Sequence, residues 1–278
     1  MMSRKNKKGE NGKVLMVGGS ETYTGAVTLA GLATLRSGVD WVTIAAPKKV
    51  AWTINSLTPD LITIKLPGKI LKKTHAKKII AESKKHDILL MGNGLGLENE
   101  TIQAVKLINE KINKPKVMDA DAIKVLRLEE LSNTIITPHL KEVEMILMNS
   151  FISMKKINKI GQEKNVEKRA KLIKETIGNE FFENNIILLK GPVDSIIGKK
   201  IVYNKTGNQG MTKAGTGDVL AGLVAGFLAQ SNDPLESARK AAKVNGQIGD
   251  VLLKQRKGFT YLASDMVQDI SKFLNRKP

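Results

Sequence analysis

Short, continuous apolar runs alternate with amphipathic stretches along the first two thirds of the chain. The runs predict strands at 14–17, 41–46, 87–91, 116–118, 134–136 and 186–189. Between them, helical spacing of apolar positions predicts helices at 25–37, 71–85, 98–111, 139–148 and 166–177. Strands that are apolar on both faces are typical of sheets covered by helices on both sides. The alternation therefore predicts an α/β fold with a doubly wound, mostly parallel central sheet.

The pattern changes after residue 192. Two short apolar runs, 193–197 and 201–204, flank the sequence Gly198-Lys-Lys200 and predict a late antiparallel hairpin. Three helices are expected after it, at 218–229, 234–253 and 262–273. No linker rich in Pro, Gly or Ser interrupts the interior, so we expect a flexible basic tail at 1–12 and a single domain at 13–278.

The chain is strongly basic. Its 278 residues carry 45 Lys and Arg against 27 Asp and Glu, a formal charge of +18, concentrated at 1–13 and 155–174. Such charge can attract nucleic acid, but neither stretch interleaves aromatic residues for base stacking. We therefore favour a solvated, lysine-rich surface as the explanation of the charge. A third explanation is a positive field that collects small anionic substrates such as nucleotides.

Composition excludes several other classes. The chain has no cysteine and three widely separated histidines, so disulfide scaffolds and Cys-ligated metals are excluded and a His-based metal site is not expected. No apolar run reaches the roughly 20 residues that span a membrane. The N-terminus lacks the apolar core of a secretory signal, and we therefore expect a cytoplasmic protein.

The segment 207–222 carries the clearest chemistry. Its small residues Ala214, Gly215, Thr216 and Gly217 precede an apolar helix, whose first N–H groups lack partners and favour anions. Asp218 begins that helix, where a carboxylate beside an anion hole can act as general base toward a hydroxyl. The alternative is structural, because Asp is also favoured as a helix cap and a Gly-rich loop can be only a turn.

The Gly215-Thr-Gly-Asp218 helix start resembles the anion hole and catalytic Asp of the ribokinase-like superfamily. Seven further motifs, together in family order, resemble the NAD(P)H-hydrate dehydratases. They are Gly18-Gly-Ser20, Tyr23-Thr-Gly-Ala26 with Leu29-Ala-Gly-Leu-Ala33, Gly92-Asn-Gly-Leu-Gly96, Met118-Asp-Ala-Asp-Ala122, Thr137-Pro-His139 with Glu142, Leu189-Lys-Gly191, and Gly207-Asn-Gln-Gly-Met211. Each is weak alone, and their order makes the assignment specific.

The resemblance implies repair of hydrated NADH and NADPH. A hydroxyl on the nicotinamide ring would be phosphorylated from ADP, with Mg²⁺, and loss of phosphate would restore the double bond and leave AMP. Asp218 would be the catalytic base and residues 214–217 the anion hole. The implied substrate-binding residues are Ala26, Gly94, Gly96, His139 and Asp218. The implied nucleotide-binding residues are Lys190, Gly191, Pro192, Val193, Asp194, Asn208 and Gly217.

Two residues depart from the family pattern: Asn93 stands where Pro is common, and Asp194 where Thr is common. Asp119 or Asp121 could hold the metal, and both could equally cap a strand end. The resemblance also implies a homo-oligomer, tetrameric or larger, and a separate NAD(P)H-hydrate epimerase, for which 278 residues leave no room. Two competing functions stay open: a ribokinase-superfamily kinase of a vitamin precursor such as hydroxymethylpyrimidine or hydroxyethylthiazole, and, from another class, a basic nucleic-acid-binding protein.

Overall fold

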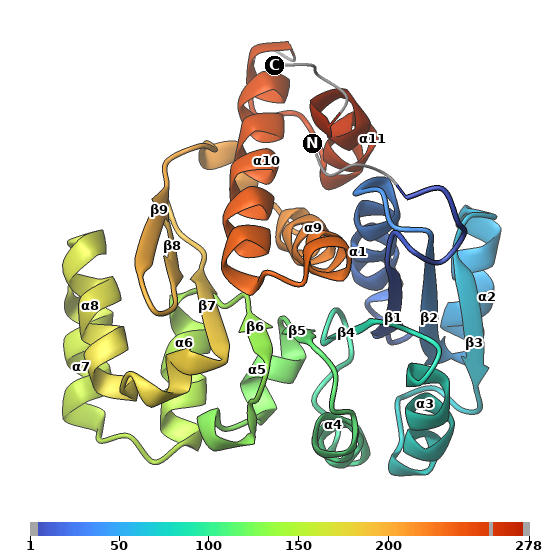
Figure 1. Ribbon diagram of the computed structural model, residues 1–278, viewed down its shortest axis with the longest axis horizontal. Coiled ribbons are helices and arrows are strands. Elements are labelled where there is room, and N and C mark those ends of the chain that lie inside the picture. Colours follow the sequence, from blue (N-terminus) through green and yellow to red (C-terminus); the bar gives the residue numbers. More distant parts are fainter. Residues whose placement is uncertain (1–4, 256–257, 275–278) are drawn as a thin grey trace.

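The computed structural model describes residues 5–255 and 258–274, which form a nine-stranded sheet with helices on both faces (Figure 1). The strands are β1 (Lys13–Val17), β2 (Trp41–Pro47), β3 (Ile62–Leu66), β4 (Ile88–Met91), β5 (Lys116–Met118), β6 (Thr134–Ile136), β7 (Asn185–Leu189), β8 (Asp194–Ile197) and β9 (Ile201–Asn204). The helices are α1 (Thr24–Arg36), α2 (Lys48–Leu57), α3 (Ala76–Ser83), α4 (Asn99–Lys111), α5 (Asp121–Val125), α6 (Leu140–Asn149), α7 (Met154–Gln162), α8 (Val166–Ile177), α9 (Thr216–Ser231), α10 (Pro234–Gln255) and α11 (Ala263–Leu274). Short 3₁₀ turns are η1 (Lys73–His75), η2 (Leu128–Glu130), η3 (Glu180–Glu183) and η4 (Gln209–Thr212).

The strand order is β3-β2-β1-β4-β5-β6-β7-β8-β9. All pairs from β3 to β7 are parallel, and β7, β8 and β9 pair antiparallel. The chain moves outward from β1 to β3 and then returns to place β4 on the other side of β1. The expected doubly wound, mostly parallel sheet with a late hairpin is thus confirmed. Within the described ranges, no helix is long and apolar enough to cross a membrane.

The sequence pattern did not predict four elements: α2, β3, α5 and α7. Strand β3 lies at the sheet edge and mixes Thr and Lys with its apolar residues, and of these only Leu66 is fully buried. Helix α7 lies inside the basic segment and buries only Ile157 and Ile160. The helix expected at 71–85 is shorter, because η1 precedes α3. Strand β3 alternates apolar and polar residues and so forms no continuous apolar run, α5 has only five residues, and α7 buries too few residues to mark a helix.

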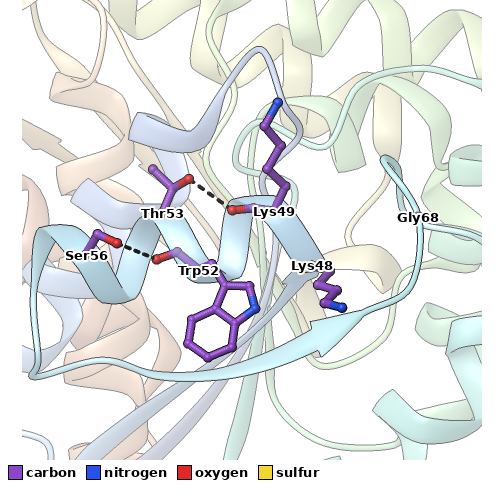
Figure 2. Close-up of a pocket in the computed structure, with 6 residues that line it drawn as sticks. All are labelled: Lys48, Lys49, Trp52, Thr53, Ser56 and Gly68. Carbon is purple, nitrogen blue, oxygen red and sulfur yellow. Dashed lines mark hydrogen bonds between the residues drawn. The ribbon is translucent and has the colours of Figure 1, made fainter.

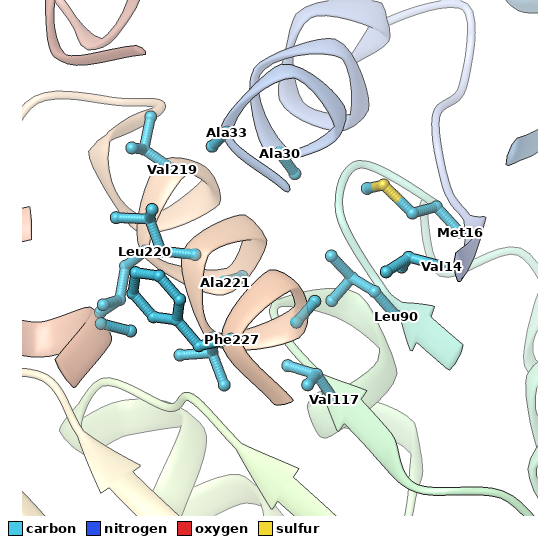
Figure 3. Packing of buried hydrophobic residues seen from close by; sticks show 14 of the residues in the cluster. Val14, Met16, Ala30, Ala33, Leu90, Val117, Val219, Leu220, Ala221 and Phe227 are labelled. Atoms are coloured by element: carbon cyan, nitrogen blue, oxygen red, sulfur yellow. The ribbon is translucent and has the colours of Figure 1, made fainter. Parts of the chain in front are cut away.

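Two hydrophobic cores lie on opposite faces of the sheet. Alternate residues of β1 serve each core: Val14 and Met16 face α1, α2, α9, α10 and α11, while Leu15 and Val17 face α3 to α8. Figure 3 shows the first core, where α9 covers β1, β4 and β5. Because successive strand side chains point to opposite faces, burial on both sides requires the unbroken apolar run in the sequence.

Helices α1 and α9 pack unusually closely. A Cβ on Gly222 would lie 2.3 Å from the carbonyl oxygen of Ala30, and one on Gly226 would lie 1.9 Å from Ser37 Oγ. Thr34 Oγ1 also donates to the Gly222 carbonyl at 3.0 Å. These contacts fix the axis of α9, and therefore the position of the catalytic candidate at its first turn.

The inner part of the expected basic tail contacts the domain. The N–H groups of Gly9 and Asn11 donate to Asp40 Oδ2 at 2.6 and 3.0 Å, and Asn11 is buried. This anchors the chain just before it enters β1. Residues 1–4 of the tail lie outside the described residues.

Candidate active site

Two loops meet where the strand order reverses, at the carboxyl ends of β1 and β4. The Gly19 N–H donates to the Asn93 carbonyl at 2.8 Å. A Cβ on Gly94 would lie 3.2 Å from the Cβ of Ala26 and 2.7 Å from that of Tyr23. Ala26 and Gly94, both expected on the substrate side, are therefore neighbours although they are far apart in sequence. In open α/β sheets this reversal point is where ligands bind.

Asp218 lies in the first turn of α9, behind the N-cap residue Gly215, whose φ is +92°. Its Oδ1 accepts a hydrogen bond from Asn93 Nδ2 at 2.7 Å, and α9 has no side-chain cap. The capping role considered for Asp218 is therefore excluded. The Thr216 N–H donates to the Lys213 carbonyl at 3.4 Å, and the first regular helical bond runs from the Val219 N–H to the Gly215 carbonyl at 3.1 Å. The N–H groups before Val219 belong to the helix terminus, which has no intrahelical acceptors to offer them.

Asn93 joins two carboxylates. The same Nδ2 group also donates to Asp119 Oδ2 at 2.9 Å, and the Asn93 side chain is 1% exposed. Burial and the nearby Asp119 raise the pKa of Asp218 to about 6, while the Asn93 hydrogen bond and Lys190 lower it. Asp218 is thus poised to exchange a proton near neutral pH, as a general base requires.

Lys190 lies on the other side of Asp119. Its Nζ is 3.1 Å from Asp119 Oδ1 and 3.8 Å from Glu142 Oε2. Burial alone would lower the pKa of Lys190, but the two carboxylates outweigh it and raise the pKa. A Cβ on Gly217 would lie 3.5 Å from this Nζ, so the start of α9 and the expected nucleotide-binding block meet here. The arrangement places a fixed positive charge beside an anion-binding helix terminus.

His139 both caps α6 and remains accessible. Its Nδ1 accepts the Glu142 N–H at 3.3 Å, and Glu142 Oε2 accepts the His139 N–H at 2.9 Å. The imidazole side chain is 52% exposed. The capping function is present, and the exposed ring can still contact a substrate.

The expected nucleotide block, 190–194, is a turn between β7 and β8. Asp194 closes this turn by accepting the Gly191 N–H at 3.1 Å and Asn204 Nδ2 at 3.0 Å, and burial raises its pKa. Its carboxylate therefore shapes the turn, and these two hydrogen bonds satisfy the acid at a position where Thr is common in the family. Gly191 and Pro192 are exposed.

Asn208 belongs to a separate hydrogen-bonded group. Its Oδ1 accepts Tyr261 Oη at 2.7 Å, and its Nδ2 donates to Asp250 Oδ1 at 3.1 Å. These bonds hold the 207–211 segment against α10 and the loop that precedes α11. A nucleotide contact by Asn208 remains a prediction.

The two carboxylates considered for a metal are already engaged by protein donors. Asp119 accepts from Asn93, Thr137 and Lys190, and Asp121 accepts the Gly96 N–H while pairing with Lys124. Across 5–255 and 258–274, no three His, Asp or Glu side chains gather as metal ligands. Mg²⁺ commonly uses only one or two carboxylates and takes its other ligands from phosphates and water.

Two participants were not expected from sequence. Thr137 Oγ1 donates to Asp119 Oδ1 at 2.7 Å and so orients that carboxylate. Asn93 stood out only as an exception to the family pattern, and its bridge to Asp218 spans 125 positions. The available signal was a polar residue inside a buried Gly-rich turn.

Sequence comparisons identify relatives of this chain. The family model described as NAD(P)H-hydrate dehydratase matches residues 14–272. A bifunctional NAD(P)H-hydrate repair enzyme from Pyrobaculum aerophilum is 37% identical over 98% of the chain, but only 52% of that protein is covered. An ADP-dependent (S)-NAD(P)H-hydrate dehydratase from Nitrosopumilus maritimus is 36% identical over 96% of this chain and 90% of its own. The chain thus spans about half the length of the bifunctional relatives.

Solved structures share the fold. A ribokinase-like superfamily protein from Enterococcus faecalis superimposes with a TM-score of 0.79 at 23% identity, over 97% of this chain and 88% of that one. An ADP/ATP-dependent NAD(P)H-hydrate dehydratase from Bacillus subtilis, co-crystallized with ATP and Mg²⁺, gives 0.75 at 24% identity, over 99% and 95%. The expected ribokinase-like fold is confirmed.

Proposed function

Because the chain belongs to the NAD(P)H-hydrate dehydratase family, we propose that it dehydrates hydrated NADH and NADPH with ADP as the phosphoryl donor. The observation that carries this proposal is the position of Asp218. Its carboxylate lies at the N-terminal turn of α9, near Lys190, with a pKa raised to about 6. A base and an anion site side by side suit phosphoryl transfer to a hydroxyl.

In the proposed mechanism, the ring hydroxyl attacks the terminal phosphoryl group of ADP and gives its proton to Asp218. The N–H groups at residues 214–217 and the Lys190 ammonium stabilise charge on the phosphoryl oxygens as AMP leaves. The ring C–O bond then breaks, a proton leaves the neighbouring ring carbon, and the double bond is restored. The products are NAD(P)H, phosphate and AMP.

Asn93 and Thr137 position the carboxylates for this sequence. Asn93 holds Asp218 and Asp119 on one amide group, and Thr137 holds Asp119 toward Lys190. Lys190 is then kept protonated and available to a phosphate. Mg²⁺ bound with the nucleotide would neutralise phosphate charge. A Bacillus subtilis dehydratase that was co-crystallized with ATP and Mg²⁺ supports this cofactor choice.

The finer parts of the proposal concern the nucleotide donor and the cellular setting. ADP is proposed as the donor because the Nitrosopumilus relative is named for it. We further propose a cytoplasmic homo-oligomer, tetrameric or larger, that works beside a separate NAD(P)H-hydrate epimerase. Size-exclusion chromatography with light scattering tests the assembly, and a single-subunit mass would contradict it.

The test is recovery of the dihydronicotinamide absorbance from hydrated NADH or NADPH with Mg²⁺ and either ADP or ATP. The proposal predicts nucleotide-dependent recovery that is faster with ADP and is lost in Asp218→Asn. Asp265→Asn, on α11, serves as a variant with the same chemical change outside the site. No recovery from folded protein that binds nucleotide would overturn the proposal and favour a vitamin-precursor kinase.

A further inference from the structure

A basic pocket of about 560 Å³ opens along α2, outside the residues used by the proposed mechanism (Figure 2). Its lining residues are Lys48, Lys49, Trp52, Thr53, Ser56 and Gly68. Helix α2 buries its opposite face in the core through Val50, Ala51 and Ile54. The face of α2 that lines the pocket therefore does not pack in the core, and its residues can be replaced without disturbing the core.

Trp52 is the unusual residue in this pocket. Its side chain is 56% exposed, and Lys65 Nζ lies 4.5 Å from the ring centroid. A large indole left in water beside ammonium groups suits a flat, anionic aromatic ligand. Nucleic-acid bases stack on such rings regardless of base identity, because every base presents a π-face.

Two lysines supply charge on opposite sides of the start of α2 (Figure 2). Lys48 is four residues before Trp52, a spacing that places both on one helix face, and Figure 2 shows them on the same side of α2. Lys49 points to the other side, where its Nζ is 3.9 Å from Glu21 Oε1. This exposed pair is long and therefore weak, so Lys49 can exchange Glu21 for a phosphate.

The pocket lies beside the proposed catalytic site. Helix α2 starts directly after β2, and Gly68 follows β3, so both lie at the carboxyl edge of the sheet. Strands are spaced about 4.8 Å apart, and β2 is two strands from β4, so the start of α2 is roughly 10 Å across the sheet from Asn93. Glu21 lies in the loop that carries Tyr23, whose Cβ closely approaches Gly94.

We propose that this pocket binds the adenosine end of the hydrated dinucleotide. Adenine stacks on Trp52, the ribose 2′-phosphate of the NADPH form contacts Lys48, and the pyrophosphate passes Lys49 on its way to Asp218. The inference rests on the proposed function and extends it, because it makes hydrated NADPH the preferred substrate over hydrated NADH, which has no 2′-phosphate.

Steady-state kinetics on both hydrates test the assignment. Lys48→Ala should raise KM for hydrated NADPH by about fivefold and leave hydrated NADH unchanged, from roughly 1 kcal/mol per exposed ion pair. Lys49→Ala should raise KM for both hydrates. Trp52→Ala should raise KM for both hydrates by roughly 5- to 150-fold, the range of base stacking. In every variant kcat should be unaffected.

Lys77→Ala is the matched control, since it removes the same exposed charge from α3, on the opposite face of the sheet. It should leave both KM values at the wild-type level. Equal KM ratios for NADPH and NADH hydrates in wild type and Lys48→Ala would overturn the 2′-phosphate assignment. Unchanged KM in Trp52→Ala would overturn the pocket itself.

A binding measurement separates this inference from the proposed activity. The chain has two tryptophans, Trp41 and Trp52. Adenosine 2′,5′-bisphosphate should quench the fluorescence, and Trp52→Phe should abolish the quenching. Quenching without any turnover would contradict the proposed function and leave the adenosine site standing. Turnover with no quenching and unchanged KM values would contradict the adenosine site alone.

Discussion

Replacing Asp218 with Asn should stabilise the folded protein at neutral pH while it abolishes turnover. Burial and the nearby Asp119 raise the pKa of Asp218 to about 6. The folded protein therefore binds this proton more tightly than the unfolded chain, and ionising the carboxyl opposes folding. Asn is close in shape, carries no charge, and keeps an oxygen that can accept the Asn93 hydrogen bond.

The magnitude follows from the two pKa values. The pKa of Asp218 rises from 3.8 in the unfolded chain to about 6 in the folded protein. At roughly 1.4 kcal/mol per pH unit, this difference lowers the free energy of unfolding by about 3 kcal/mol when the carboxyl is ionised. Asp218 is partly open to solvent, so this value is an upper limit. This loss of stability is absent below pH 3.8, where the folded and unfolded states both hold the proton. It grows as the pH rises from 3.8 to about 6 and reaches its full size above pH 6.

Urea unfolding of wild type and Asp218→Asn at pH 4 and pH 8 measures this effect. The variant should gain stability at pH 8 and little at pH 4. Asp121→Asn provides the contrast in the same region, because it loses an ion pair with Lys124 at 2.7 Å and should show no gain at pH 8. The reasoning is refuted if Asp218→Asn is destabilised at pH 8, or if its gain is equal at both pH values.

Other substitutions probe the geometry around this carboxylate. Gly92→Ala should lower activity and thermal stability, because φ at Gly92 is +130° and the new Cβ would lie 1.8 Å from the Asp119 carbonyl oxygen; wild-type activity and Tm would contradict this close approach. Gly222→Ala should cost about 1–3 kcal/mol in thermal melts by forcing α1 away from α9, and an unchanged Tm would contradict their close packing. The kcat/KM of the proposed reaction should fall below pH 6, where Asp218 becomes protonated. Asn93→Ala should move this fall to higher pH, because the Asn93 hydrogen bond lowers the pKa of Asp218. Identical pH profiles of wild type and variant would argue against this role of Asn93.

The burial of strands determined how much of the fold could be predicted. Residues 14–17 are buried on both faces of the sheet, so every position is apolar and the run is conspicuous. Strand β3 lies at the sheet edge, where it pairs with β2, and its sequence Ile-Thr-Ile-Lys-Leu alternates apolar and polar residues instead of forming a continuous apolar run. Helix α2 was missed because its apolar face is narrow and begins with two exposed lysines.

The candidate site likewise has one part that could be predicted from the sequence and one part that could not. Asp218 and the small residues before it could be predicted, because a helix terminus is a local feature that needs no other part of the chain. The links from Asn93 to Asp218 and from Lys190 to Asp119 could not, since they span 125 and 71 positions. Only the order of the strands brings those loops to one edge.

Product stoichiometry tests the central claim most directly. The protein would be incubated with hydrated NADPH, Mg²⁺ and ADP, and NADPH, AMP and phosphate quantified by chromatography. Dehydration predicts the three products in equal amounts, with none formed by Asp218→Asn. AMP formed together with a phosphorylated dinucleotide, and no NADPH, would contradict the account and indicate a kinase.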